Sequence, residues 1–253
     1  MTVDPRAATG FASAVDAYER GRPSYPPVAI TNLAREFGLT PASTVLDLAA
    51  GTGKLTRRLV GLVGSVIAVD PSEAMRAELH DRLPAVDARP GTAEAIPVAD
   101  GSVDAVFVGE AFHWFRTTEA LHEIARVLSP GGGLALLWNR AHWSEKELPW
   151  LTAFGELLDP YRKAAGPFPA EGDDWKSALQ ATGAFAPLSS AEVDHVLTTT
   201  PDDLVALVSS WSWIANLPDG DRADVLGRVR ELVGPQQRLT LRYRTDIHWT
   251  RLV

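Results

Sequence analysis

The central part of the chain alternates between two hydrophobic periods. Four short apolar runs predict buried strands, at residues 43–49, 65–70, 102–110 and 133–139, and the first of them is rich in β-branched residues. A weaker strand is predicted at residues 85–89. Helical spacing of apolar residues predicts amphipathic helices between these strands, at residues 53–63, 72–83 and 117–128. Strands and helices that alternate in this way predict a parallel sheet with right-handed crossovers and helices on both faces.

The pattern is looser on both sides of this region. Helical spacing returns in three stretches: 11–38, 144–183 and 201–233. Two further stretches predict strands: 186–198 and 238–253. We interpret residues 1–253 as one domain with a core, an N-terminal lid and two helical additions: 40–139, 8–38, 144–183 and 201–233.

The composition narrows the possible classes of function. The absence of cysteine excludes disulfides, iron–sulfur clusters and thiolate metal sites, and no group of His and Asp residues has the spacing of a metal site. A formal net charge of −8 without a basic stripe argues against nucleic acid as a partner. Because the chain has neither a long apolar run nor a leader-like N-terminus, we expect a cytoplasmic protein that stays out of the membrane, as a monomer or homodimer.

A glycine turn follows the first predicted strand, in the stretch VLDLAAGTGKLT (45–56). A P-loop is disfavoured because Leu48 takes the place of its first glycine and Leu55 that of its hydroxyl residue. A dinucleotide site matches at Gly51 and Gly53, but Thr56 holds the position of its third glycine. The turn therefore matches neither phosphate-binding pattern completely.

An acid before the turn, Asp47, distinguishes between the ligands that such a turn can bind. A carboxylate beside a pyrophosphate is costly in a medium of low dielectric. S-adenosylmethionine (SAM) instead carries an ammonium and a sulfonium group, which Asp47 can attract directly or through water. Asp70, at the end of the next strand, suits the two ribose hydroxyls, although an NAD site also uses an acid there. In a sheet of this kind the turn, Asp70 and residues 109–115 are expected to meet beyond the carboxyl ends of the strands.

Four segments together resemble the successive motifs of class I SAM-dependent methyltransferases: VLDLAAGTGKLT, VIAVDPSEAM, GTAEAIPVADGSVDAVFVGEAFHWF and EIARVLSPGGGLALLWN. More narrowly, they resemble the small-molecule type 11 branch, which includes relatives of trans-aconitate methyltransferase. The resemblance implies an α/β fold with a doubly wound, Rossmann-like sheet of seven strands, mostly parallel with an antiparallel last strand, and helical lid elements. It also implies SAM as cofactor, S-adenosylhomocysteine as its product, and a small-molecule acceptor.

The same resemblance assigns a cofactor site residue by residue. Asp70 matches the acid that binds ribose, residues 92–94 match a segment beside adenine, and Glu110 matches a position beside the methionine moiety. The family often has glycine where this chain has Ala49, and a methyl group is tolerable there if φ is negative. The implied cofactor-binding residues are Tyr18, Arg22, Asp47, Ala49, Gly51, Gly53, Asp70, Pro71, Met75, Thr92, Ala93, Glu94, Glu110 and Ala111.

The acceptor side is predicted from one histidine and several aromatic residues. His113 follows the fourth strand at the expected mouth of the site, either as a general base or as a side chain that shapes the pocket. Trp114, Trp211 and Trp213 are the other candidates for the substrate pocket. In a helix, Trp211 and Trp213 would splay apart, with one of them facing the core.

These residues favour transfer of a methyl group to an O, N or C nucleophile of a small molecule by in-line displacement. One alternative is a non-catalytic protein that binds SAM or another nucleoside. A second is an NAD-linked oxidoreductase, which the missing third glycine and Asp47 disfavour.

Overall fold

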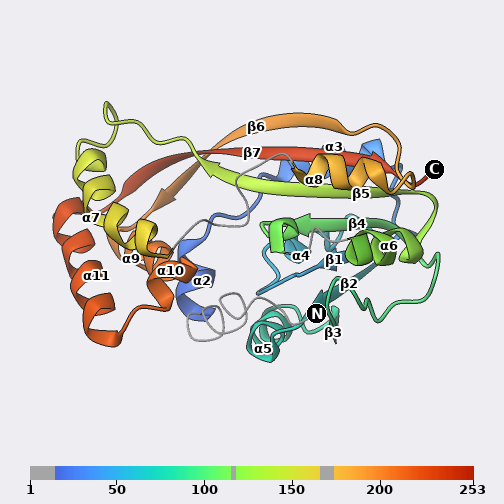
Figure 1. The fold of residues 1–253 in the computed structure, drawn as a ribbon, viewed down its shortest axis with the longest axis horizontal. Coiled ribbons are helices and arrows are strands. Elements are labelled where there is room, and N and C mark those ends of the chain that lie inside the picture. The colour runs from blue at the N-terminus through green and yellow to red at the C-terminus, as the bar shows by residue number, and fades with distance from the viewer. Residues whose placement is uncertain (1–14, 115–117, 166–173) are drawn as a thin grey trace. The chain divides into compact units, whose positions relative to one another are not determined.

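The computed structural model describes residues 15–114, 118–165 and 174–253. Seven strands of these residues form one sheet in the order β3-β2-β1-β4-β5-β7-β6 (Figure 1). Their bounds are β1 Thr44–Leu48, β2 Ser65–Asp70, β3 Asp87–Pro90, β4 Val103–Gly109, β5 Leu128–Ala141, β6 Ser189–Thr199 and β7 Leu239–Arg251. The doubly wound sheet predicted from the sequence is thus confirmed.

The first five strands are parallel. β1 pairs with β2 on one side and with β4 on the other, β2 pairs with β3, and β4 pairs with β5. From β1 the chain adds strands first outward to β3, then on the opposite side to β4 and β5. The strand order therefore reverses between β1 and β4, and a sheet of this type binds its ligands beside that reversal.

The last strand runs in the opposite direction. Leu252 donates its backbone N–H to Gly132 O (2.9 Å), and the Thr245 hydroxyl donates to Asn139 Oδ1 (2.6 Å). A residue later in β5 thus pairs with a residue earlier in β7. This confirms the antiparallel last strand that the resemblance implied.

The helices of the described residues occupy most of the predicted stretches. They are α2 Val15–Gly21, α3 Pro27–Glu36, α4 Thr56–Leu59, α5 Glu73–Arg82, the 3-10 helix η1 Phe112–Trp114, α6 Thr118–Val127, α7 Leu151–Ala164, α8 Asp174–Ala181, α9 Pro201–Ser209, α10 Ser212–Ala215 and α11 Asp219–Val233. Parts of the predicted lid (8–14) and of the first helical addition (166–173) lie outside the described residues.

Two predicted elements differ in extent from the observed ones. The helix predicted at 53–63 is only α4, because Gly53 (φ 83°) and Gly61 (φ 85°) hold left-handed turns on either side of it. The strand predicted at 133–139 runs from Leu128 to Ala141, and a register shift opposite Val103 and Ala105 accommodates its glycines.

The described residues form two compact units. The first contains those of 1–23, 140–168 and 194–244, and the second those of 24–139, 169–193 and 245–253. β5, β6 and β7 contribute residues to both units. The organisation as a single domain stays a prediction.

The second unit has a core on each face of its sheet. Alternate residues of a strand point to opposite faces, so Val45 and Leu46 enter different cores. α3 and α4 cover one face, and α6 and α8 cover the other. Layers on both sides leave the ends of the parallel strands as the place where polar groups meet.

The first unit has an aromatic core of its own. Rings from the segment after β5, from α7 and from β7 contact one another edge to face, with Trp143 6.0 Å from Tyr243 and Trp150 5.5 Å from Phe154. α9 and α11 add buried leucines and valines to this core.

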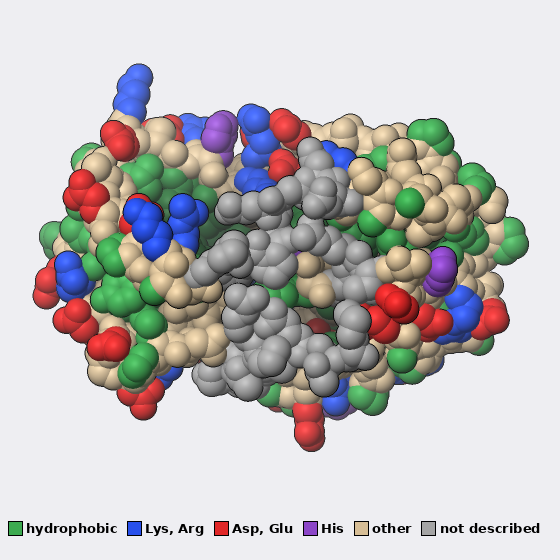
Figure 2. All heavy atoms as spheres, viewed as in Figure 1, with side chains coloured by type: hydrophobic (Ala, Val, Ile, Leu, Met, Phe, Trp, Pro, Cys, Tyr) green, Lys and Arg blue, Asp and Glu red, His purple; other side chains and the backbone are tan. Residues whose placement is uncertain are grey.

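The surface and the polar clusters add little to this picture. Figure 2 shows acidic and basic side chains intermixed over the visible face of the described residues. No helix in these residues has the length and hydropathy to span a bilayer. In the same part of the chain, no three or more His, Cys, Asp or Glu side chains form a group that could hold a metal ion.

Candidate functional site

The glycine turn after β1 has an unusual backbone. Gly51 (φ 55°) and Gly53 (φ 83°) both adopt left-handed conformations. A Cβ on Gly53 would lie 3.0 Å from the Leu79 side chain of α5, so this glycine allows close packing. Among the described residues, no atom would lie within 4 Å of a Cβ on Gly51, so these residues leave open space at its Cα. The turn is thus packed at one glycine and open at the other.

Ala49 departs from expectation. Its φ is 58°, in the left-handed region, whereas a methyl group was expected to be tolerable there only at negative φ. This conformation costs an alanine about 1–2 kcal/mol. Glu110 has the same conformation, with φ 57°, just after β4. Two non-glycine residues with left-handed backbone therefore follow the two strands that flank the reversal of strand order, and such strain concentrates at functional sites.

Asp70 is held in place by the turn itself. It ends β2, is buried, and accepts backbone N–H groups from Gly51 at Oδ2 (2.9 Å) and from Ser72 at Oδ1 (2.8 Å). Arg76 donates to the backbone carbonyl of Asp70 (2.7 Å). Burial raises the pKa of Asp70, and the two N–H groups oppose that rise. Each carboxylate oxygen has further lone pairs with which to accept hydrogen bonds from a ligand.

Asp47 lies deeper than Asp70. It is 1% exposed, and the Thr56 hydroxyl donates to Oδ2 at 2.5 Å. Burial raises the pKa of Asp47 to about 7, and the charge of Asp70 adds to the rise. Of the two predicted routes to a ligand, direct contact is closed to so buried a side chain in this conformation. Its charge acts through the turn or through an intervening group.

The predicted residues after Asp70 have local structural roles. Ser72 caps α5 by accepting from the Met75 N–H (3.4 Å). Met75 is buried, whereas Pro71 is exposed. Pro71 is therefore placed at the surface of the site, and Met75 packs inward.

The loop after β3 carries Thr92, Ala93 and Glu94. Thr92 and Ala95 face each other in a tight turn, with Ala95 N–H donating to Thr92 O (3.2 Å). Ala93 is buried, while Thr92 and Glu94 are half-buried. These side chains follow the strand next to β2 in the sheet, on the same edge as Asp70.

The end of β4 is connected to two further strands. Glu110 Oε1 accepts from the Asn139 N–H of β5 (2.5 Å), and Asn139 accepts from Thr245 of β7, which has no exposed surface. Sequence reasoning missed Asn139 and Thr245. Asn139 is the last residue of the motif EIARVLSPGGGLALLWN, but nothing in the sequence paired it with Thr245.

Aromatic residues surround the same strand end. A Cβ on Gly109 would lie 2.2 Å from the hydroxyl of buried Tyr25, a residue that sequence reasoning did not assign to the site. His113 lies in η1 with its ring centroid 4.9 Å from that of Trp114. Ala111 and Trp114 both pack against the core that includes α6 and α8. Trp114 thus has a packing role, which leaves its predicted pocket role untested.

The remaining predicted residues lie together in the first unit. Arg22 donates from Nε to Ser210 Oγ (3.0 Å), and its guanidinium lies 5.5 Å from the centre of the Tyr18 ring. Trp211 and Trp213 stack, with centroids 5.2 Å apart and planes at 27°. The two rings were expected to splay apart if both residues lie in a helix, and that condition is not met. Trp211 has an extended backbone and precedes α10 as its N-cap, so the two side chains do not follow helical geometry.

Known proteins are similar to this chain over residues that include β1 and β4, the two strands between which strand order reverses. A family model described as a methyltransferase domain matches residues 46–136. An uncharacterized methyltransferase of Mycobacterium tuberculosis is 42% identical over 225 residues, which is 88% of this chain and 85% of that protein. A malonyl-[acyl-carrier protein] O-methyltransferase of Methylococcus capsulatus is 38% identical over 128 residues, 48% of this chain and 46% of that protein. A solved structure from Anaeromyxobacter dehalogenans, described as a type II methyltransferase, has a TM-score of 0.66 at 22% identity and covers 91% of this chain and 97% of that one.

Proposed function

The chain belongs to the class I methyltransferases, whose methyl donor is SAM, and from that premise we propose that it methylates a small-molecule acceptor by in-line displacement. The observation that carries the proposal is the position of Asp70. Its carboxylate, at the end of β2, is held by Gly51 and Ser72, and Gly51 follows β1, one of the two strands between which strand order reverses.

The residues present fit SAM better than a dinucleotide. Asp70 retains acceptor capacity on both oxygens, which suits a pair of ribose hydroxyls. Open space at Gly51 permits close approach of a ligand to the backbone. Asp47, Asp70 and Glu110 give this edge of the sheet acidic groups, and these favour the ammonium and sulfonium of SAM over the diphosphate of NAD.

The proposal gives the predicted residues of the second unit these roles. Residues 49–53 form the turn, Asp70 binds the ribose, residues 92–94 lie beside adenine, and Glu110 with Ala111 lies beside the methionine moiety. Pro71 and Met75 complete the cofactor side, and Trp114 lines the acceptor pocket. The lid role of Tyr18 and Arg22 and the pocket role of Trp211 and Trp213, which all lie in the first unit, stay predictions.

The chemistry asks little of the protein beyond alignment. When bound, SAM would supply an electrophilic methyl group on a sulfonium, whose sulfur leaves as the neutral thioether of S-adenosylhomocysteine. The side chains of the site orient the acceptor and exclude water, and such positioning is worth about 7–11 kcal/mol of a barrier. An acceptor that is already ionised, such as a carboxylate, needs no base.

His113 is our candidate for the group that accepts a proton from an acceptor that is not ionised. His113→Ala is then expected to lower kcat while leaving the Kd for SAM unchanged, because the histidine acts on the acceptor. Equal loss of turnover and of SAM affinity would instead assign His113 to the cofactor pocket or to the fold.

The proposal is tested by methyl transfer into a cell extract. The purified chain, tritiated SAM and extract are incubated, and the label is separated into small molecules, protein and nucleic acid. We expect label in small molecules other than SAM and its breakdown products, and the loss of those labelled species with Asp70→Ala. Label only in the protein or nucleic acid fraction would overturn the acceptor class. Binding of SAM without transfer would favour a non-catalytic role, and tighter binding of NADH than of SAM would favour the oxidoreductase.

A further inference from the structure

The loop that joins β3 to β4, residues 91–102, has little regular structure of its own. Its inward side chains are Ala93, Ile96 and Val98, which are 5%, 4% and 7% exposed. Backbone carbonyls in such a segment need partners from elsewhere in the fold. Two arginines supply such partners here. Arg89 precedes the loop in the sequence, and Arg126 follows it.

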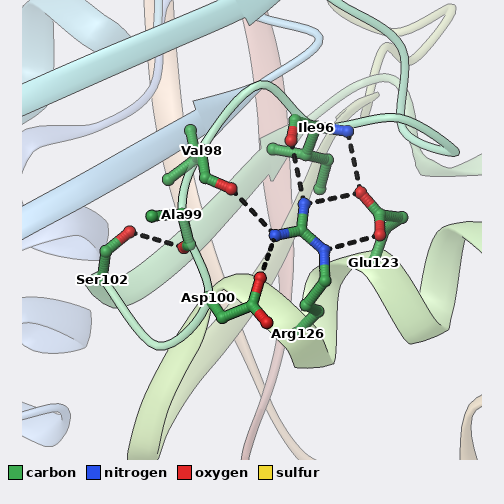
Figure 3. A network of polar contacts seen from close by, with 7 residues as sticks. All are labelled: Ile96, Val98, Ala99, Asp100, Ser102, Glu123 and Arg126. Atoms are coloured by element: carbon green, nitrogen blue, oxygen red, sulfur yellow. Dashed lines mark hydrogen bonds and ion pairs between the residues drawn. The ribbon is translucent and has the colours of Figure 1, made fainter.

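Arg126, in the last turn of α6, uses all of its hydrogen-bond donors (Figure 3). Nε and Nη2 donate to the two oxygens of Glu123 at 2.6 and 2.7 Å. Nη2 also donates to Ile96 O at 2.9 Å, and Nη1 donates to Val98 O at 2.9 Å and to Asp100 Oδ1 at 2.6 Å. A guanidinium has five N–H groups, so none is left over.

Glu123 closes the network from the other side. It accepts the backbone N–H of Ile96 at Oε2 (2.9 Å), so Ile96 is held through both its N–H and its carbonyl. The pKa of Glu123 is lowered chiefly by the hydrogen bonds from Arg126. The carboxylate therefore stays charged near neutral pH, and the network does not depend on a proton in that range.

Arg89, in β3, holds the carbonyl between these two. Its Nη1 donates to Pro97 O (2.7 Å), and Asp87 accepts from its Nε (3.0 Å) and orients it. Three consecutive carbonyls, of residues 96, 97 and 98, thus accept from two arginines. Gly91 packs against Pro97, since a Cβ on Gly91 would lie 2.6 Å from the proline ring. The first residue of the loop therefore packs against the middle of the loop, where the two arginines bind the carbonyls.

We propose that Arg126 and Arg89 are positioning residues that hold residues 92–94 in the conformation that recognises adenine. The inference rests on the proposed function, which places residues 92–94 beside the base. Neither arginine acts on the cofactor directly. Each fixes backbone groups of the loop, so that binding does not have to order a mobile segment.

Lysine cannot replace Arg126 in this role. A lysine keeps the positive charge, but its single ammonium carries three donors at one point and cannot reach two carbonyls and two carboxylates at once. If the fork geometry positions the loop, Arg126→Lys behaves like Arg126→Met. If only charge matters, Arg126→Lys behaves like the wild-type protein.

The test measures base selectivity in the full chain. Calorimetry gives the Kd of S-adenosylhomocysteine and of S-inosylhomocysteine, in which hypoxanthine replaces adenine. We expect Arg126→Met and Arg126→Lys to weaken S-adenosylhomocysteine by about 10-fold or more and to bring the ratio of the two Kd values toward one. Arg89→Met is expected to act in the same direction with a smaller effect. Wild-type selectivity in folded Arg126→Met would overturn the proposal.

A matched control is available at Arg251. It also donates to two backbone carbonyls, Gly131 O (2.8 Å) and Glu36 O (2.5 Å), but it has no hydrogen bond to the loop. Gly131 lies near the start of β5, at the amino ends of the parallel strands, whereas the site lies at their carboxyl ends. Arg251→Met is expected to leave both Kd values unchanged, and an equal change there would assign the effect to general loosening.

Hydrogen exchange without any ligand separates this proposal from the proposed function. In Arg126→Met, the amide of Ile96 and its neighbours in residues 91–102 are expected to exchange faster than in the wild-type chain, and in Arg251→Met at the wild-type rate. Unchanged exchange in Arg126→Met would overturn the positioning role. If the wild-type chain binds neither nucleoside, the proposed function fails while the exchange result still decides whether the arginines order the loop. Should Arg126→Met not fold, Arg126→Lys and Arg89→Met give the same readouts.

Discussion

Replacing Asp47 with asparagine is expected to stabilise the protein and to make its stability less dependent on pH. The side chain is 1% exposed, and burial raises its pKa from 3.8 to about 7. The folded state therefore holds this proton between those pH values while the unfolded state releases it. Stability contributed by the proton is present at low pH and is lost as pH rises toward 7.

The size of the effect follows from the shift. At about 1.4 kcal/mol per pKa unit, a charged Asp47 costs the folded protein about 4 kcal/mol above pH 7. Much of this change falls between pH 5 and pH 8, where the wild-type protein is expected to lose about 2–3 kcal/mol relative to Asp47→Asn. An asparagine has nearly the same shape and can still accept from the Thr56 hydroxyl, so its packing is preserved.

Urea denaturation at pH 5, 6, 7 and 8 measures this difference. The free energy of unfolding is extrapolated to water for both proteins, without ligand. Asp70 also has a raised pKa, but it titrates in both proteins, so most of its contribution cancels in the difference. Parallel pH profiles for the two proteins would refute the reasoning, since Asp47 would then carry no folded-state shift.

The same variant links stability to binding. A charged Asp47 lowers the stability of the fold, so stability does not explain its presence. Attraction of a cationic ligand explains it. We therefore expect Asp47→Asn to bind SAM about 10-fold more weakly at pH 8 while unfolding at higher urea. A variant that is more stable and binds SAM as tightly as the wild-type protein would remove Asp47 from the proposed site.

Four other positions give shorter tests. Ala49→Gly relieves a left-handed alanine and is expected to raise stability by about 1 kcal/mol, or the Tm by about 2–4 °C. Gly51→Ala introduces the same strain where no atom of the described residues lies within 4 Å of the new Cβ, and it is expected to lower the Tm by a similar amount. Shifts of equal sign in thermal unfolding would contradict this account. Asp70→Ala removes the acceptor for the Gly51 N–H and the proposed ribose ligand, so calorimetry is expected to show SAM binding weakened about 10- to 100-fold, and an unchanged Kd would exclude the role. Thr245→Val removes the hydroxyl that donates a hydrogen bond to Asn139, and it is expected to raise KM for SAM with little change in kcat. Thr245→Ser keeps a hydroxyl and is expected to have the wild-type KM. Equal KM values in the two variants would show that the hydroxyl is not used.

Much of the fold was predictable because its strands are continuous apolar runs. β1, β2 and β4 have nearly the predicted bounds, since a strand buried on both faces leaves a clear signal. α4 was overestimated because the apolar spacing of residues 53–63 continues through glycines whose positive φ breaks the helix. Periodicity reports which side chains are buried and does not report where the backbone turns.

The site was predictable where one short motif contains both partners. Asp70 and Gly51 follow consecutive strands, so their meeting follows from a parallel pairing. The left-handed backbone of Ala49 was not predictable, because alanine itself favours negative φ. Arg126 and Ile96 come together only in the folded sheet, and no local pattern pairs an arginine of α6 with a carbonyl of the preceding loop.

The place of β7 in the sheet has a consequence for how the protein is made. β7 lies beside β5 and supplies Thr245 to Asn139, yet α7, α8, β6, α9, α10 and α11 are all synthesised between β5 and β7. While residues 45–139 emerge, β5 has no neighbour on its outer side, and its apolar edge is open to pairing with another chain. In a fragment that stops after the segment matched by the methyltransferase family model, β5 would have no strand to pair with on its outer side. The parallel core is therefore expected to aggregate when expressed alone and to become soluble when β7 is restored.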